Sequence, residues 1–311
     1  MEKPIVRILL TTYNGERYIR SMIDSIMEQD YENWELIVSD DGSGDSTVAI
    51  LDEYAHNNPD RITHHRSGRR FGCAQKHFMH LLRTFSDAPY IMFCDQDDVW
   101  HRDKVSKTLQ CMLRQTDPTR PTLVHTDLRV VDQDLKELAP SFCAHSALDG
   151  NRTQLAQLLV QNVITGCTMM LNQPLVMLAC RACEEEKMLM HDWWIGLIAA
   201  AFGSVEFLPE ATIDYRQHGT NSVGAKDVHS VSYLMHRLRS AKMRKALQKA
   251  AAQAGAFADC FADQLCVQQM ELLRAFAATE NANIWRRNRI YLDYGLLKAG
   301  FIRRTAQLLG L

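Results

Sequence analysis

Residues 90–98, Tyr90-Ile-Met-Phe-Cys-Asp-Gln-Asp-Asp98, form the stretch that decides the fold of this 311-residue chain. An apolar run, Tyr90 to Cys94, is followed at once by three acids within four positions. Such a run is typical of a buried strand in a parallel sheet. Ligands of open α/β sheets bind beyond the carboxyl ends of the strands, so we expect the functional site around residues 95–98.

The chain before this strand alternates predicted strands and predicted helices. Apolar runs predict strands at residues 5–10, 34–39 and 61–65. Apolar residues at helical spacing predict helices at 19–27, 46–55 and 78–85. This order predicts an α/β fold with a Rossmann-like, mostly parallel central sheet that is flanked by helices and joined by right-handed crossovers.

After Trp100 the pattern is mixed. Predicted strands cover residues 122–126, 168–171, 205–208 and 212–215, and predicted helices cover 154–161, 174–187 and 192–202. From Val228 onward the pattern is helical throughout, and 219–224 is typical of a loop. We therefore expect a first domain over residues 1–222 and a C-terminal helical extension over 225–311.

Composition excludes several classes of protein. With 46% apolar and 23% charged residues the chain is an ordinary globular protein. Its longest serious apolar stretch, 193–202, is too short to span a membrane, and no signal-peptide pattern precedes the first strand. Nine cysteines without framework spacing favour a reducing compartment, so we expect a cytoplasmic protein. Cys180 and Cys183 form a C-x-x-C without a second pair, which argues against structural zinc.

Charge is distributed unevenly. Residues 225–311 carry a net charge of +8 and residues 1–224 carry −10. Confinement of the positive charge to one end argues against nucleic-acid binding by the whole chain. The basic end has two open interpretations, a solvated helical face or docking on an anionic membrane surface where a lipid-linked acceptor would be presented. We expect peripheral membrane association.

Polar residues follow three of the predicted strands, at 11–15 (Thr-Thr-Tyr-Asn-Gly), 40–43 (Asp-Asp-Gly-Ser) and 95–98. Turn formation and helix capping alone would explain Asp-Asp-Gly-Ser. The carboxylates of 95–98 repel one another unless a cation or donors neutralise them, and oxygen ligands suit Mg²⁺ or Mn²⁺. A solvated acidic turn is the alternative. No P-loop and no G-x-G-x-x-G is present, so a metal held by aspartates would hold a diphosphate, and Asp40 and Asp41 could accept hydrogen bonds from a base or ribose.

Two later clusters bear on chemistry. Asp192, next to Trp193 and Trp194, could act as a general base, and the two tryptophans are expected in the core rather than under a sugar. Arg216 and His218, at the end of the last predicted strand, could bind phosphate and metal. Taken alone, His218 is more typical of an ordinary hydrogen-bonded histidine.

Over residues 4–222 the chain resembles the family 2 glycosyltransferases with the GT-A fold. The motifs that carry the resemblance stand at residues 12–15, 40–43, 95–98, 191–194 and 215–218. Cys94–Trp100 and Ile-Thr-Gly-Cys-Thr-Met-Met at 164–170 make it most similar to bacterial rhamnosyltransferases of cell-wall and surface polysaccharide assembly. Processive members have membrane spans and a Gln-x-x-Arg-Trp segment, which this sequence lacks.

The resemblance implies a role for each matching residue. Thr12, Tyr13, Asp40 and Asp41 would hold the base and ribose of a nucleotide sugar. Asp95 and Asp97 would be the acids of the D-x-D motif, with Asp97 or Asp98 binding the divalent metal. Asp192 would be the catalytic base, and His218, with Arg216 beside it, would complete the metal or diphosphate site.

The expected activity is a metal-dependent, inverting transfer of a sugar, L-rhamnose from dTDP-rhamnose, onto a lipid-linked or saccharide acceptor. Charge develops on the departing diphosphate, and a base on the opposite face of the sugar would take the acceptor proton. Alternatives are a UDP-hexose donor, a nucleotidyltransferase, and an inactive transferase-like scaffold. Thr-Thr-Tyr-Asn-Gly replaces the Gly-rich loop of nucleotidyltransferases, and the acids that a scaffold would have lost are present.

Overall fold

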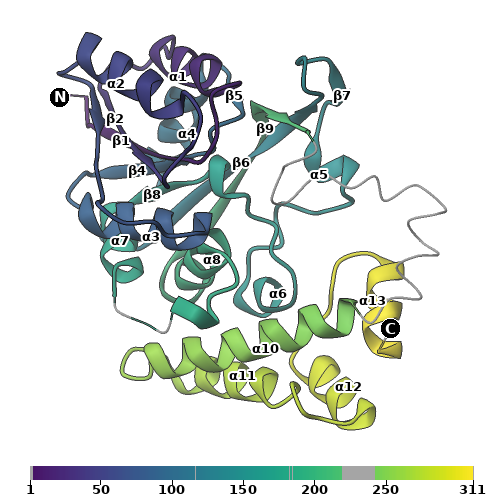
Figure 1. Ribbon diagram of the computed structural model, residues 1–311. Coiled ribbons are helices and arrows are strands. Elements are labelled where there is room, and N and C mark those ends of the chain that lie inside the picture. Colours follow the sequence, from purple (N-terminus) through teal and green to yellow (C-terminus); the bar gives the residue numbers. More distant parts are fainter. Residues whose placement is uncertain (1–2, 116, 182, 184, 219–241, 311) are drawn as a thin grey trace.

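A computed structural model describes residues 3–115, 117–181, 183, 185–218 and 242–310, and the fold is given for these. The strands are β1 Val6–Thr12, β2 Trp34–Asp40, β3 Ile62–His64, β4 Tyr90–Cys94, β5 Val99–Trp100, β6 Thr122–Val131, β7 Glu137–Ala139, β8 Met170–Asn172 and β9 Ser204–Arg216. Among the described residues they form a nine-stranded sheet in the order β3-β2-β1-β4-β8-β6-β9-β5, with β7 beside β6 (Figure 1).

Helices follow in the same numbering. They are α1 Ile19–Met27, α2 Thr47–Asn57, α3 Ala74–Thr84, α4 Lys104–Leu113, α5 Phe142–His145, α6 Leu155–Val160, α7 Gln173–Ala179, α8 His191–Phe202, α10 Lys242–Cys260, α11 Val267–Ala277, α12 Ile284–Asp293 and α13 Phe301–Leu309. Two 3₁₀ turns, η1 Gly166–Thr168 and η2 Glu185–Lys187, lie before β8 and α8. No helix of the described residues is long and apolar enough to cross a bilayer.

The first half of the sheet is parallel, as expected. In register, Thr12 of β1 lies opposite Asp40 of β2, and Leu10 lies opposite Cys94 of β4. The carboxyl ends of β1, β2 and β4 therefore meet at one edge of the sheet. The polar residues that follow these strands share that edge.

The second half is mixed, which corrects the expectation of a mostly parallel sheet. β8 runs antiparallel to β4 and β6, whereas β6 and β9 are parallel. The predicted strands 205–208 and 212–215 are one strand, β9, because its pairing with β6 continues across a register shift near Asp127. The predicted helix 174–187 ends at Ala179, and the charged residues Glu185–Lys187 form the separate turn η2.

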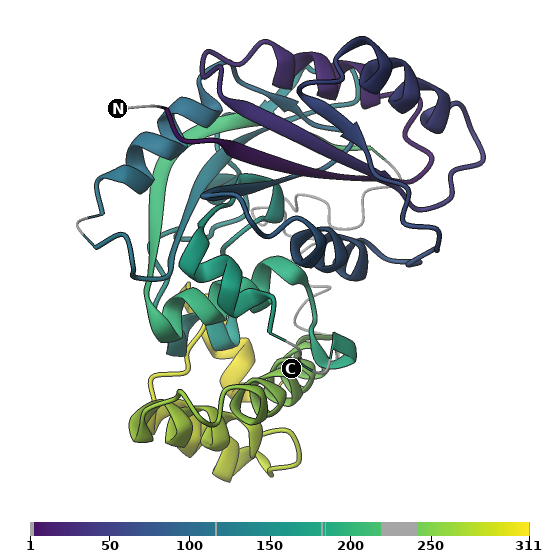
Figure 2. The ribbon, with the colours of Figure 1, turned by 90° about the vertical axis from the view of Figure 1, so that its left-hand side faces the viewer.

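Alternating strand residues build two cores on opposite faces of the sheet. Ile8 and Leu10 face one core with α1, α2 and α4, whereas Leu9 faces the other with α3, α7 and α8. Figure 2 shows the helices on both sides of the twisted sheet. This sandwich holds the strand ends that carry the candidate site.

The C-terminal helices pack on the α8 side of the molecule (Figure 1). Trp194 of α8 is fully buried, and its ring lies 5.2 Å from that of Phe257 in α10, so the expected core role of this tryptophan is confirmed. A disulfide joins Cys183 to Cys260, a pairing over 77 residues that the C-x-x-C spacing did not indicate. The expected boundary at 222–225 and loop at 219–224 lie outside the described residues.

Candidate active site

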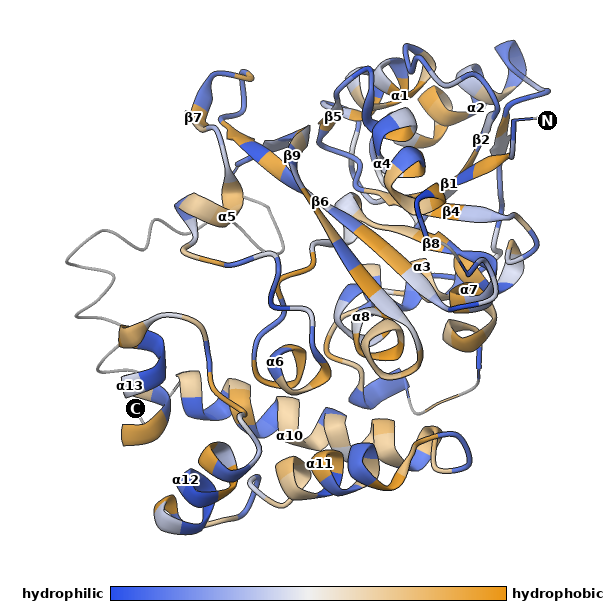
Figure 3. Ribbon diagram, turned by 180° about the vertical axis from the view of Figure 1, so that it is seen from behind, coloured by the Kyte–Doolittle hydropathy of each residue, from blue (hydrophilic) through white to orange (hydrophobic). Residues whose placement is uncertain are grey.

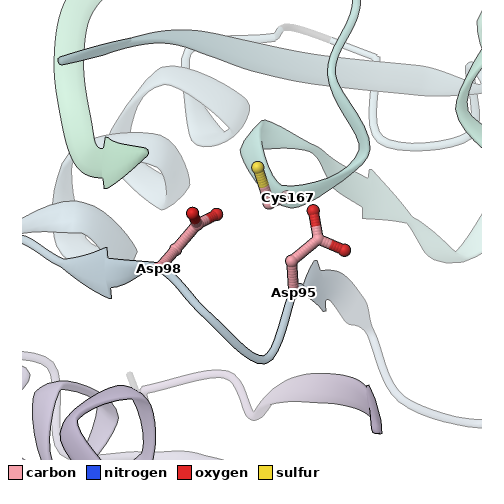
Figure 4. Close-up of side chains that lie close together, drawn as sticks. All are labelled: Asp95, Asp98 and Cys167. Carbon is pink, nitrogen blue, oxygen red and sulfur yellow. The ribbon is translucent and has the colours of Figure 1, made fainter. Parts of the chain in front are cut away.

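The loop between β4 and β5 carries the aspartates of the deciding stretch. Carboxylate oxygens of Asp95 and Asp98 and the sulfur of Cys167 lie within 4.8 Å of one another (Figure 4). Cys167 belongs to η1, which packs against β4. Two oxygen donors and a sulfur this close are a set that could hold a metal ion.

Burial and mutual repulsion raise the pKa values of these acids. Burial, with the charges of Asp97 and Asp192, raises the pKa of Asp95 to about 7. Burial raises the pKa of Asp98 well above its usual range, although the Arg216 backbone N–H donates to Asp98 Oδ1 at 3.1 Å. A bound cation would reverse this repulsion, so the acids fit the expected Mg²⁺ or Mn²⁺.

Lys104, the first residue of α4, is a buried cation near the loop. Its Nζ lies 4.7 Å from the centre of the Trp100 ring, and burial lowers the pKa of Lys104 to about 8. Its positive charge acts on Asp98, Cys94 and Cys167. Lys104 therefore offsets part of the negative charge of Asp98.

Asp97 and His218 form a second group. His218 Nε2 lies 2.6 Å from Asp97 Oδ2, and the histidine ring stacks on Tyr18 with 5.0 Å between ring centres. Arg216 is buried, and it donates from Nε to the Asp97 carbonyl at 2.8 Å and from Nη1 to the Gln133 carbonyl at 2.6 Å. The end of β9 thus holds both the backbone and a side chain of the acidic loop.

Asp192 lies in the first turn of α8 and is buried. Its Oδ1 accepts hydrogen bonds from the Trp193 N–H at 2.5 Å and from Asn162 Nδ2 at 3.3 Å. Burial raises the pKa of Asp192 to about 7 against the lowering effect of these donors. A Cβ at Gly166 would lie 3.8 Å from the Cβ of Asp192, and the next residue, Cys167, lies beside Asp95 and Asp98, so Asp192 lies near the acidic loop although it stands far from it in sequence.

Gly166 allows η1 to pack against the start of α8. A Cβ at Gly166 would lie 2.7 Å from His191 Nε2, closer than real contacts allow. His191 itself packs against Phe78 and Phe93. Gly166 and Cys167 belong to the motif at residues 164–170, and this motif was the sequence signal for the contact between η1 and α8. No sequence pattern indicated that Asn162 contacts Asp192.

The residues expected at the nucleotide lie at the ends of β1 and β2. Thr12 Oγ1 donates to Asp40 Oδ1 at 2.9 Å, and Asp40 Oδ2 accepts from the Gly42 and Ser43 N–H groups. Asp40 therefore also closes its own turn, as the turn interpretation predicts. Tyr13 is 56% exposed, which leaves its ring accessible at the rim of the site.

Asp41 and Gln96 connect neighbouring loops. Asp41 accepts from the N–H groups of Phe71 and Gly72, which holds the loop before α3. Gln96 accepts from the Tyr13 N–H at 2.9 Å and donates to the Tyr13 carbonyl at 3.1 Å. Gln96, like Tyr18, was missed from sequence, because neither side chain suggests chemistry by type.

Comparisons with known proteins identify relatives of this chain. The model of the family "Glycosyl transferase family 2" matches residues 7–173. The dTDP-rhamnosyl transferase RfbG of Shigella flexneri is 26% identical over 251 residues, which cover 78% of this chain and 83% of RfbG. The glucosyltransferase WfgD of Escherichia coli is 29% identical over 114 residues, 37% of this chain, and the match spans less than half of WfgD, 43%.

Solved structures share the fold. TarS of S. aureus, residues 1–349, matches with a TM-score of 0.59 at 14% identity, over 88% of this chain and 71% of that one. The mannosyltransferase PcManGT of Pyrobaculum calidifontis, solved with GDP-Man and Mn²⁺, matches with a TM-score of 0.56 at 18% identity, over 99% and 79%. The expected GT-A fold is confirmed, and the chain is a glycosyltransferase that belongs to glycosyl transferase family 2.

Proposed function

We propose that the chain transfers L-rhamnose from dTDP-rhamnose, with inversion, onto a lipid-linked or saccharide acceptor in surface polysaccharide synthesis. The observation that carries the proposal is that η1 packs against both Asp192 and the acids Asp95 and Asp98, which brings Asp192 close to the Asp95–Asp98 loop. The name of RfbG supports the donor, and that of WfgD, which acts on a diphosphoundecaprenol-linked sugar, supports a lipid-linked acceptor.

The donor would lie across the ends of β1, β2 and β4. Thr12, Tyr13, Asp40 and Asp41 would contact the base and ribose, which their place at the strand ends and the exposed Tyr13 ring support. Asp95 would lie at the diphosphate. Arg216, bonded to the Asp97 and Gln133 carbonyls, would keep the loop in place beside it.

A divalent ion, Mg²⁺ or Mn²⁺, would be held by Asp97, Asp98 and His218, with Asp95 close by. When bound, such an ion neutralises charge on the departing diphosphate. The closeness of the Asp95 and Asp98 carboxylates supports the place of Asp98 in this set, and the contact of His218 with Asp97 supports the other two.

Asp192 would take the proton from the acceptor hydroxyl. Its Oδ1 is oriented by Trp193 and Asn162, and a pKa of about 7 lets the carboxylate hold a proton and release it near neutral pH. Attack from the side of Asp192, with the diphosphate leaving on the other side, inverts the anomeric centre.

A panel of nucleotide sugars with Mg²⁺ or Mn²⁺ tests the proposal, with the anomeric configuration of the product read by NMR. We expect turnover of dTDP-rhamnose to exceed that of UDP-hexoses, with inverted product. A preference for a UDP-hexose would show that the donor is a UDP-hexose and not dTDP-rhamnose. A product with retained configuration would exclude Asp192 as the sole base. Absence of turnover with every donor would favour an inactive transferase-like scaffold.

The C-terminal unit, which we place at 225–311, would attach the enzyme to the inner face of the cell membrane. Trp285 and Phe301 are each 84% exposed, and Leu292 is 60% exposed. Leu292 stands seven residues after Trp285, on the same face of α12, with the exposed Arg289 between them. Figure 3 shows that α12 and α13 carry hydrophobic and hydrophilic residues together. Exposed aromatic and basic residues side by side suit an anionic bilayer.

Sedimentation with anionic liposomes at low salt tests this attachment. We expect the wild-type chain to sediment, and a Trp285→Ala/Leu292→Ala variant to stay largely in the supernatant. Leu138→Ala, which removes a side chain 55% exposed on β7, is the control. Equal sedimentation of all three chains would show that Trp285 and Leu292 do not attach the chain to the membrane.

A further inference from the structure

A strongly basic pocket lies on the outer side of α3. Its volume is about 290 Å³, and Arg69, Arg70, Lys76 and Arg83 line it together with one acid, Glu185. Arg69 and Arg70 come from the loop before α3, Lys76 and Arg83 from the helix, and Glu185 from η2. The roles assigned above to the strand-end residues do not use this pocket.

Protein contacts hold the basic side chains in place. Arg69 Nη2 lies 3.1 Å from His80 Nδ1, and its guanidinium carbon lies 4.8 Å from the centre of the Phe71 ring. Arg70 Nη2 donates to the Gly42 carbonyl at 2.8 Å, and Arg83 is ion-paired with Glu185. Side chains fixed before binding lose less entropy when a ligand arrives.

Two donors of the pocket residues have no acceptor in the part of the chain that the structure describes. Arginine always donates, so His80 Nδ1 accepts from Arg69 and the proton of the neutral ring is on Nε2. His80 Nε2 and Arg83 Nη2 are buried and have no hydrogen-bond partner among the described residues. Buried donors without an acceptor are costly, and an anion would offset that cost.

Among the described lining residues, one acid stands against four basic side chains. Four permanent cations face Glu185, which is already paired with Arg83. Burial first, and then the charges of Arg69, His65 and Arg83, lower the pKa of His80. An arginine guanidinium binds two phosphate oxygens at once, and a phosphate or diphosphate carries enough negative charge to match several cations. A carboxylate ligand, with a single charge, would need fewer cations.

We propose that this pocket binds a phosphate or diphosphate group other than that of the donor, namely the diphosphate of a lipid-linked acceptor. The assignment of the acceptor rests on the proposed function. Through Arg70 and through Asp41, which holds Phe71, the pocket borders the end of β2, where the base and ribose would lie. None of its described lining residues belongs to the loop after β4, where the donor diphosphate would lie. Glu185 lies in η2, directly ahead of the helix that carries Asp192, which links the pocket to the acceptor side. At about 290 Å³ the pocket is at the small end for ligand sites and fits a diphosphate group better than a whole nucleotide sugar.

Calorimetric titration of the full chain with inorganic pyrophosphate, in EDTA so that no divalent ion assists binding at the aspartates, tests the site. We expect the wild-type chain to bind and an Arg69→Gln/Lys76→Gln variant to bind about tenfold or more weakly. Arg66→Gln is the matched control, because Arg66 lies in the same loop, is exposed and pairs with Asp52 outside the pocket. Absence of binding to the wild-type chain, or equal binding to the double variant and the control, would overturn the site.

Steady-state kinetics then distinguish the source of the phosphate. We expect the double variant to raise KM for a polyprenyl-diphosphate acceptor, but not for the same saccharide on a neutral alkyl chain, and to leave the donor KM unchanged. A raised donor KM would overturn the separation from the donor site. If the double variant binds pyrophosphate more weakly but its kinetics are unchanged, the pocket binds an anion, but that anion is not the diphosphate of the acceptor. If no donor is turned over, the proposed function fails, while the calorimetric result for the pocket still stands.

Discussion

His218 Nε2 lies 2.6 Å from Asp97 Oδ2, so the segment after β9 is hydrogen-bonded to the loop after β4. Arg216 holds the backbone of the same loop, and Gln96 ties it to Tyr13 at the end of β1. Three contacts from distant parts of the chain therefore fix one acidic loop before any ligand binds. A site held in this way loses little free energy to rearrangement when a charged group arrives.

Replacement of Asp97 should remove metal-dependent turnover and leave the fold intact. We expect Asp97→Ala to lower kcat at least about a hundredfold, because Asp97 is proposed to hold the ion that stabilises the leaving diphosphate. Turnover at several Mn²⁺ concentrations and the melting temperature would be measured together. The control is Asp60→Ala, an exposed acid in the turn before β3, at the opposite end of the parallel strands. Activity of the Asp97 variant equal to that of the control would reject the metal assignment.

The pH dependence of kcat should follow Asp192. The base must be ionised to accept a proton, and burial raises its pKa to about 7. We therefore expect kcat to rise about tenfold per pH unit below 7 and to level above it. A flat profile between roughly pH 5.5 and pH 8 would contradict the role of Asp192 as the base.

Asp192→Asn should stabilise the fold while it abolishes turnover. A carboxyl group whose folded pKa lies above its unfolded value of 3.8 contributes stability at low pH, and this contribution is lost as the pH rises through about 7. At pH 8 the neutral amide therefore avoids the cost of a buried charge. Urea unfolding at pH 5 and pH 8 would measure this, with a larger gain for the variant at pH 8. A loss of stability at pH 8 would indicate that the hydrogen bonds to Asp192 outweigh the burial of its charge.

The parts of the fold that the sequence predicts are those encoded by local patterns. β1, β2 and β4 are continuous apolar runs because both faces of these strands are buried, and the turn residues after them mark their ends. α1 repeats apolar residues at helical spacing because one face packs on the sheet. α4, over Lys104–Leu113, was missed, since its buried face includes Lys104 and Thr108 as well as apolar residues.

The parts that could not be predicted depend on contacts between distant residues. β9 reads as two strands because Pro209 and Glu210 interrupt its apolar pattern, and its pairing with β6 shows that it is one. Asp95–Asp98 and Asp192 were singled out by residue type, and their roles stay predictions. The positions of Cys167 near the acids and of Cys260 next to Cys183 come from packing between elements, which no local pattern encodes.

Gly166→Ala should damage the fold and the site together. The new Cβ would lie 2.7 Å from His191 Nε2 in a packed core, and we expect a loss of about 1–3 kcal/mol in the free energy of unfolding. Displacement of His191 also shifts the neighbouring Asp192, so kcat should fall. Gly44→Ala is the control, because nothing lies within 4 Å of a Cβ at that position. Equal stability of the two variants, measured by urea unfolding, would show that η1 can move away from α8 without cost.

Phe257→Ala should show that the C-terminal helices support catalysis through packing. Phe257 of α10 is fully buried against Trp194 of α8, two residues after Asp192. Truncation leaves a cavity, and we expect a loss of about 3–5 kcal/mol in the free energy of unfolding. Because the cavity borders α8, kcat should also fall under conditions in which the variant is still folded, as checked by circular dichroism. The matched control is Phe301→Ala, which removes the same side chain from a position 84% exposed and should leave both stability and kcat with a soluble acceptor unchanged. A destabilised Phe257 variant with wild-type kcat would mean that α8 keeps Asp192 in place without support from α10.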